Sequence, residues 1–118
     1  MNEPSFNEYQ AQTRNTAIYP GERESSEAQA YTVVGLANEV GEVAGVYKKW
    51  LRGDFGDSTD AQDVMALRMQ DELGDVLWYL ARVADEFGLE LNEVAARNIA
   101  KLQQRQKTGH LKTEEGQR

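Results

Sequence analysis

Two long stretches of helical periodicity constrain the fold of this chain more than any other feature. Apolar residues recur at intervals of three and four residues along 33–51 and again along 69–87. This spacing places them on one face of a helix and is typical of helices packed in a bundle. The apolar stripes consist of Val33, Leu36, Val40, Val43, Tyr47, Trp50 and Leu51, and of Met69, Leu73, Val76, Leu80, Val83 and Phe87.

Turn and capping residues divide the chain into four predicted helices. Pro20 and Gly21 break the chain before the first long helix, which Ser25 or Ser26 can cap, and Asn92 can cap the last helix. No alternation of apolar and polar residues indicates a strand. We expect an all-α helical bundle with helices at about 5–15, 26–51, 61–87 and 92–106.

The length of 118 residues fits a single domain, which we place at 1–106. The remainder, 107–118, is charged, lacks an apolar face and is expected to form a mobile tail. The net charge of −7 argues against binding to nucleic acid, and the absence of cysteine excludes disulfides and thiolate metal sites. No apolar run approaches the ~18 residues of a membrane span, and the acidic N-terminus is unlike a secretory signal. These features predict a cytoplasmic protein that does not bind membranes.

Each long stretch carries a pair of acids beside its apolar stripe. Glu39 and Glu42 form the first pair, and Glu72 and Asp75 form the second. Residues three apart on a helix differ by about 60° in direction and are neighbours on its surface. If the two helices pack antiparallel, the four carboxylates can converge.

Converging carboxylates repel one another or take up protons unless a cation compensates them. A set of oxygen ligands without histidine or cysteine suits Mg²⁺, with Mn²⁺ as a second possibility. The single histidine, His110, lies in the predicted tail, which argues against a di-iron site. The alternative is that the acids form an ordinary solvated helix face. Gly41 and Gly74, which lie inside the two pairs, allow either a close ligand or close packing of helices.

These motifs resemble the MazG-like all-α nucleoside triphosphate pyrophosphohydrolases, in which E-x-x-E is followed by E-x-x-D. The stretch GLANEVGEVAGVYKKWLRGD is similar to the second helix of that family. DELGDVLWYLARVADEFGLELNEVAARNIAKLQQR is similar to its third and fourth helices. The resemblance covers about residues 31–105. It implies a four-helix type of bundle that is completed by formation of a homodimer or homotetramer.

The resemblance also implies a reaction and a set of site residues. Family members hydrolyse nucleoside or deoxynucleoside triphosphates to the monophosphate and pyrophosphate with Mg²⁺. It assigns metal binding to the four acids and makes Glu39 and Glu42 the candidate catalytic residues. Some relatives carry an additional water-activating acid where this chain has Asn38. The base is therefore either Glu39 or a hydroxide on the metal.

A triphosphate also needs cationic and polar contacts. Asn98, Lys101 and Arg105 share one side of the last predicted helix, and Lys48 lies near the end of the first long helix. Tyr79, one turn after Asp75, is the candidate for stacking on the base, whereas Trp78 is expected to pack in the protein. We predict substrate contacts from Lys48, Tyr79, Asn98, Lys101 and Arg105.

Two other functions compete with this prediction. A catalytically silent helical interaction or regulatory module could use the acidic pairs to bind a stabilising cation. A phosphohydrolase that acts on cyclic or monophosphate substrates would ordinarily use histidine ligands, which this chain lacks outside its tail.

Overall fold

The computed structural model describes residues 2–109 and confirms the all-α prediction. Within that range the secondary structure is helical, with four α-helices and one short 3₁₀ helix, η1. Their bounds are Phe6–Thr13 for α1, Arg14–Thr16 for η1, Ser26–Arg52 for α2, Ala61–Glu86 for α3 and Leu91–Thr108 for α4. The part of the predicted mobile tail at 110–118 lies outside the described residues.

The turn and capping residues predict most of the helix ends correctly. The Ser25 hydroxyl accepts a hydrogen bond from the backbone N–H of Ala28 and caps α2 as predicted. The prediction that Asn92 caps the last helix is wrong, because α4 begins at Leu91 with Glu90 as its cap residue. Asn92 instead exchanges two hydrogen bonds with Asn7, so its side chain fastens α1 to the start of α4.

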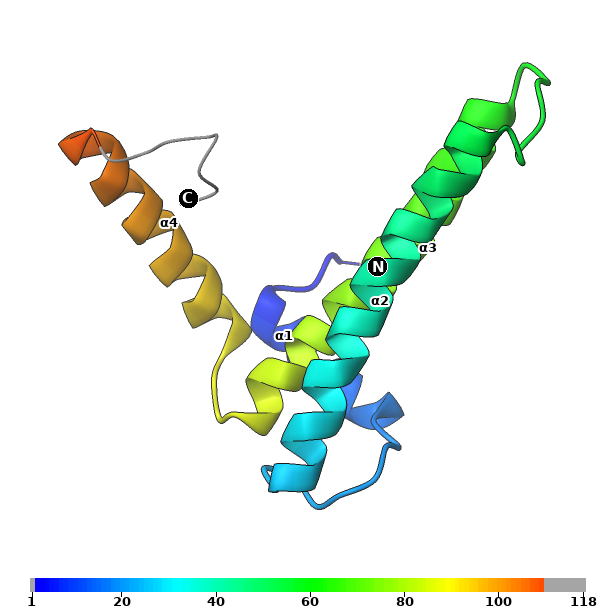
Figure 1. The fold of residues 1–118 in the computed structure, drawn as a ribbon. Helices are drawn as coiled ribbons and strands as arrows, with labels where there is room; N and C mark the ends of the chain where they lie inside the picture. The colour runs from blue at the N-terminus through cyan, green and yellow to red at the C-terminus, as the bar shows by residue number, and fades with distance from the viewer. Residues whose placement is uncertain (1, 110–118) are drawn as a thin grey trace.

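The helices form a V, and α1 lies between its two arms near the point where they meet (Figure 1). The long helices α2 and α3 pack against each other as an antiparallel hairpin, which is one arm of the V. The other arm is α4, which contacts α1 near its beginning and then diverges from the hairpin. None of the described helices is both long enough and apolar enough to cross a membrane.

The apolar stripes are only half covered within one chain. Leu36 and Val43 of α2 and Val76 and Val83 of α3 are half-buried in the hairpin. The alternate positions of the same stripes are between 42 and 53% exposed; they are Val33, Val40, Tyr47, Leu73, Leu80 and Phe87. Large apolar side chains at regular spacing on a surface mark an interaction face. A single chain therefore buries the inner half of each stripe and leaves the outer half open.

A buried network of charged side chains lies at the C-terminal end of α3. Arg82 donates hydrogen bonds to the carboxylates of Asp85 and Glu86, at 3.1 and 3.2 Å. These three side chains are at most 3% exposed. Arg14 adds two hydrogen bonds from Nε to the two carboxylate oxygens of Asp85, at 3.1 and 3.0 Å. The charges are thus paired as burial requires.

The same network fastens the N-terminal segment to the hairpin. Gln10 donates to Asp85 and to the Leu89 carbonyl, and its amide oxygen accepts from the Leu91 N–H at 2.7 Å. Tyr19 donates to Glu86, whose other oxygen accepts from the Glu24 N–H. In the described part of the chain every buried side-chain nitrogen and oxygen has a hydrogen-bond partner. This network joins α1, α3, the start of α4 and the segment before α2.

Asp85 makes the network dependent on pH. Burial disfavours the charged carboxylate, but hydrogen bonds from Arg14 and Gln10 and the charge of Arg82 outweigh it. The pKa of Asp85 therefore lies well below its usual value of 3.8. A carboxyl whose pKa is lower in the folded state stabilises the fold above its unfolded pKa. That stabilisation is lost as the pH falls toward the folded pKa.

We expect Asp85→Asn to lower the free energy of unfolding by roughly 3 kcal/mol at neutral pH, because Arg82 loses one of its two buried counter-charges and Arg14 loses its carboxylate partner. The difference from the wild type should shrink as the pH falls from about 5 to about 2, because the wild-type carboxylate is protonated there. Urea denaturation across this range measures both quantities. Asp71→Asn, an exposed acid on the same helix, is the matched control. A difference that stays constant down to the lowest pH would contradict this account.

Candidate active site

The hairpin brings three of the four predicted metal ligands together. Glu39 of α2 and Glu72 and Asp75 of α3 each offer a carboxylate oxygen, and these oxygens lie within 4.8 Å of one another. Glu39 and Glu72 are half-buried and Asp75 is exposed, so the group faces solvent from one side. The antiparallel packing of α2 on α3 is what aligns the two acidic pairs. We call these three residues the carboxylate group.

The electrostatics of the carboxylate group favour a cation. Burial raises the pKa of Glu39, and the charges of Asp75, Glu72 and Glu42 raise it further. Each of these influences opposes the charged form of Glu39, and a divalent cation would reverse them. The ligand set consists of hard oxygen donors, which suits Mg²⁺ or Mn²⁺.

Glu42, the fourth predicted ligand, lies at the edge of this group. It is exposed on α2 and is not one of the three residues whose oxygens converge. Its charge nevertheless acts on Glu39, one turn earlier on the same helix. Glu42 is therefore close enough to raise the pKa of Glu39, but its carboxylate is not part of the carboxylate group within one chain.

Gly41 and Gly74 are not packing glycines within this chain. Apart from the neighbouring residues and the backbone of its own helix, a Cβ atom at either position would have no heavy atom within 4 Å, so close packing between α2 and α3 does not explain them. The glycine that does permit a close approach is Gly35. A Cβ there would lie 2.2 Å from Cε1 of Tyr79, so the Tyr79 ring rests directly on the α2 backbone.

The two adjacent aromatic residues of α3 have different surroundings. Trp78 donates a hydrogen bond from Nε1 to the Thr16 hydroxyl at 2.8 Å and meets the Tyr19 ring edge-on. It packs in the protein, as expected. Tyr79 instead lines an open pocket beside the carboxylate group. Burial raises the pKa of its hydroxyl, and Tyr31, Glu39 and Asp75 add to the effect.

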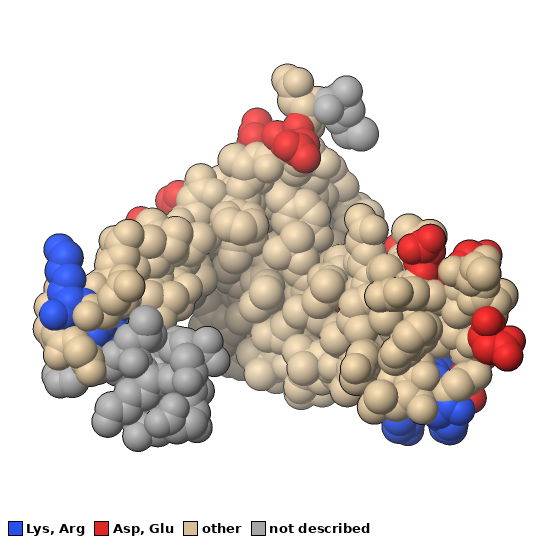
Figure 2. Space-filling model, turned by 90° about the horizontal axis from the view of Figure 1, so that it is seen from above, with Lys and Arg blue, Asp and Glu red and all other residues tan. Residues whose placement is uncertain are grey.

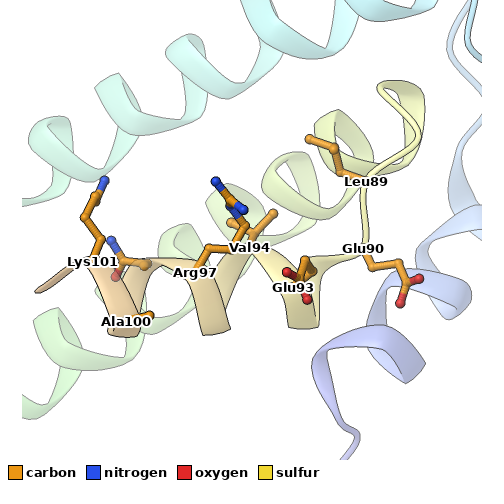
Figure 3. A pocket seen from close by; sticks show the side chains of 8 residues that line it. Leu89, Glu90, Glu93, Val94, Arg97, Ala100 and Lys101 are labelled. Carbon is orange, nitrogen blue, oxygen red and sulfur yellow. The ribbon is translucent and has the colours of Figure 1, made fainter. Parts of the chain in front are cut away.

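The predicted phosphate-binding residues lie apart from the carboxylate group. Asn98 and Lys101 line an open pocket of about 700 Å³ on α4, together with Arg97 and Glu93 (Figure 3). This arm diverges from the hairpin, so one chain does not bring these residues over its own acids (Figure 1). Arg105 lies one turn farther along α4, and Lys48 is exposed near the end of α2.

Charged side chains are unevenly distributed over the surface. Seen from above, basic side chains gather at the left end of the molecule, acidic and basic side chains occur together at the right end, and the surface between them carries few charges (Figure 2). The tip of α4 contains Arg105 and Lys107, and the last turn of α2 contains Lys49 and Arg52. Lys101 and Lys107 of α4 are exposed, and Arg105 is half-buried.

Two features of the structure were not predicted from the sequence. One is the buried network around Arg82; the signal available was that Arg82, Asp85 and Glu86 surround the stripe residue Val83 at helical spacing. The other is the pocket beside the carboxylate group, which also involves Tyr31 and Asn38. No periodic signal marks that pocket, because its residues come from three separate segments.

The observations above define the class of this protein as an all-α protein whose helical hairpin brings three carboxylates together. The sequence matches the MazG nucleotide pyrophosphohydrolase domain over residues 28–110, and the chain belongs to this family. It is also 41% identical over 103 residues to the gene 37 protein of Mycobacterium phage L5. That alignment covers 86% of this chain and 88% of the phage protein. No solved structure gives a significant match.

We expect Mg²⁺ or Mn²⁺ to stabilise the protein by about 1.4 kcal/mol at a concentration tenfold above the dissociation constant. Glu72→Gln should have two opposite effects. It should stabilise the metal-free protein, because a repelling charge is removed, and it should abolish the stabilisation by metal. Thermal unfolding with and without the cation measures both.

Glu93→Gln is the control, because Glu93 is an acid of α4 outside the carboxylate group. A response to metal that survives Glu72→Gln would place the cation elsewhere. A response lost in both variants would point to a general effect of surface charge.

Proposed function

We propose that this protein hydrolyses nucleoside or deoxynucleoside triphosphates to the monophosphate and pyrophosphate in the presence of Mg²⁺. Membership of the MazG family supports the reaction class. The observation that carries the proposal is the convergence of Glu39, Glu72 and Asp75 from two helices. Three mutually repelling carboxylates held on a rigid hairpin are suited to bind a divalent cation, which in turn binds phosphate oxygens.

The roles of the residues follow from their positions. Glu39, Glu72 and Asp75 would hold the cation, with Glu42 as the additional ligand at the edge. Bound Mg²⁺ would neutralise phosphate charge and lower the pKa of a coordinated water. Glu39 is our candidate to accept the proton when water attacks, because it lies between Glu42 and the acids of α3. The P–O bond formed by water replaces the anhydride bond between the α- and β-phosphates, and pyrophosphate leaves.

Product analysis tests the reaction. We expect nucleotide monophosphate and pyrophosphate, without orthophosphate, from a panel of triphosphates with Mg²⁺ or Mn²⁺. Glu42→Gln and Glu72→Gln should each reduce kcat at least 100-fold, as expected when a charged group that stabilises the transition state is removed. Glu22→Gln, which changes an exposed acid outside the carboxylate group and both pockets, should leave kcat unchanged. A folded, metal-binding wild type that turns over no triphosphate would favour the silent interaction module instead.

We further propose that the protein works as a homodimer or homotetramer. The outer halves of both apolar stripes are exposed in one chain, and they include Val40 and Leu73 beside the acidic pairs. A second copy is a suitable occupant, because helical bundles close by covering such stripes and a twofold axis would pair the stripe with itself. The open space beside Gly41 and Gly74 leaves room for that approach.

In such an assembly the α4 arm of one copy would bring its cations to the acids of the other. This arrangement would account for the divergence of α4 from its own hairpin (Figure 1) and for the exposure of Lys101. Lys48, on the same helix as Glu39, would contribute from within the chain. Asn98, Lys101 and Arg105 would then contact the phosphates or sugar bound on the partner.

Mixing two inactive variants tests this shared site. We expect Glu72→Gln and Lys101→Glu each to be inactive alone and to regain activity after they are unfolded and refolded together. Half of the dimers would then be mixed, and one of their two sites would be intact, so about a quarter of wild-type activity should return. Lys107→Glu, at the same arm tip, is the control and should be active by itself. No recovery on mixing would place both residues in one chain's site, and a monomer in micromolar sedimentation would contradict the assembly.

A further inference from the structure

An open pocket lies beside the carboxylate group and is lined by two tyrosines, Tyr31 and Tyr79. It has a volume of about 560 Å³ and lies between α2, Tyr79 of α3 and Pro20 of the preceding segment. This volume is within the range of small-molecule sites. The remaining lining residues are Glu27, Ala30, Val34, Gly35 and Asn38. Most of these present apolar or aromatic surface, and only a few offer polar groups.

The pocket and the carboxylate group are neighbours on both long helices. Asn38 immediately precedes Glu39 on α2, and Tyr79 lies one turn after Asp75 on α3. The charges of Glu39 and Asp75 both act on the Tyr79 hydroxyl, which shows that the pocket wall and the acids are electrostatic neighbours. A ligand whose phosphates meet the acids can therefore extend into the pocket.

The pocket is built from fixed parts. The ring of Tyr79 rests on Gly35, where a Cβ would overlap it. Tyr31 is held by stacking on Tyr19, at 5.3 Å between ring centroids. Tyr19 is in turn bound by Arg82 and Glu86 of the buried network. The rings thus have a defined spacing before any ligand arrives, which lowers the entropic cost of stacking.

Along α2, the acids and the pocket residues follow the order in which phosphate, sugar and base occur in a nucleotide. Successive turns of about 5.4 Å carry Glu39 and Asn38, then Gly35, then Tyr31, then Glu27. With phosphates at Glu39, the Asn38 amide is at the level of the sugar hydroxyls. The aromatic rings then lie at the level of the base, and Glu27 lies beyond its far edge.

We propose that this pocket binds the nucleobase and that Glu27 selects bases with an exocyclic amino group. The inference rests on the proposed triphosphate hydrolysis at the carboxylate group. A carboxylate only accepts hydrogen bonds. It therefore accepts a hydrogen bond from the exocyclic amino group of cytosine, adenine or guanine. Uracil and thymine have no amino group: at the position of the cytosine amino group they carry a carbonyl oxygen, which the carboxylate repels, and only their ring N3–H can donate. A site built to pair with a hydrogen-bond donor rejects the analogue that lacks it.

Steady-state kinetics on dATP, dCTP, dGTP, dTTP and dUTP test the selection. We expect the amino-bearing substrates to have kcat/KM values at least about tenfold higher than dTTP and dUTP. Glu27→Gln should reduce this ratio about tenfold, because a glutamine side chain can donate to a carbonyl oxygen as well as accept. Glu22→Gln, an exposed acid outside the pocket, should leave the ratio unchanged. Tyr79→Ala should raise KM for all bases, whereas Tyr79→Phe should not.

A binding measurement separates failure of the pocket from failure of the reaction. Calorimetry with the non-hydrolysable α,β-methylene analogues of dCTP and dTTP, in Mg²⁺, reports base preference without turnover. Hydrolysis of all triphosphates at equal rates would overturn the base pocket while the reaction stands. Tighter binding of the dCTP analogue, lost in Glu27→Gln, without hydrolysis of any triphosphate would support the pocket and overturn the reaction. Equal effects of Glu27→Gln on every base, or a change in oligomeric state instead of specificity, would also overturn the pocket.

Discussion

The buried network of Arg82, Asp85 and Glu86 is the interaction on which the rest of the structure depends. The apolar core of one chain is small and consists mainly of alanines, with Val46 and Leu91. At the base of the hairpin, fully paired buried charges replace apolar contacts. Such a network stabilises the fold most when every charged group has its partner. Through Gln10, Arg14 and Tyr19 the network fixes the N-terminal segment and the start of α4. One wall of the pocket beside the acids is held in place in this way.

The carboxylate group shows the opposite use of charge. In the network each buried acid meets a cation of the same chain, whereas Glu39 meets mainly other acids. Packing of α2 on α3 holds these like charges close together, and their repulsion lowers the stability of the metal-free protein. Sites that bind cations and phosphates store electrostatic free energy in this manner, and a rigid pair of helices is well suited to hold the geometry.

The half-covered stripes connect the fold to the proposed assembly. Both arms of the V present surfaces that a single chain leaves unused, namely the outer stripe positions of the hairpin and the cation-bearing side of α4. A second copy would use both at once, because its hairpin would cover the stripe and its α4 would face the acids. Stability and phosphate recognition would then depend on the same association.

The sequence by itself determined the helices and the residues of the candidate site. The three-and-four spacing of apolar residues fixed α2 and α3 to within a residue, because helical periodicity is a local property of the chain. The same spacing placed Glu39, Glu42, Glu72 and Asp75 beside the stripes, and the absence of histidine and cysteine ligands restricted the metal. Only the tertiary structure decided which half of each stripe is buried, since both halves follow the same period. It alone showed that Asn92 joins α1 instead of capping α4, and that Tyr31, Asn38 and Tyr79 enclose a pocket. Contacts between segments distant in the sequence leave no periodic trace, and the chain acquires them only when the helices pack.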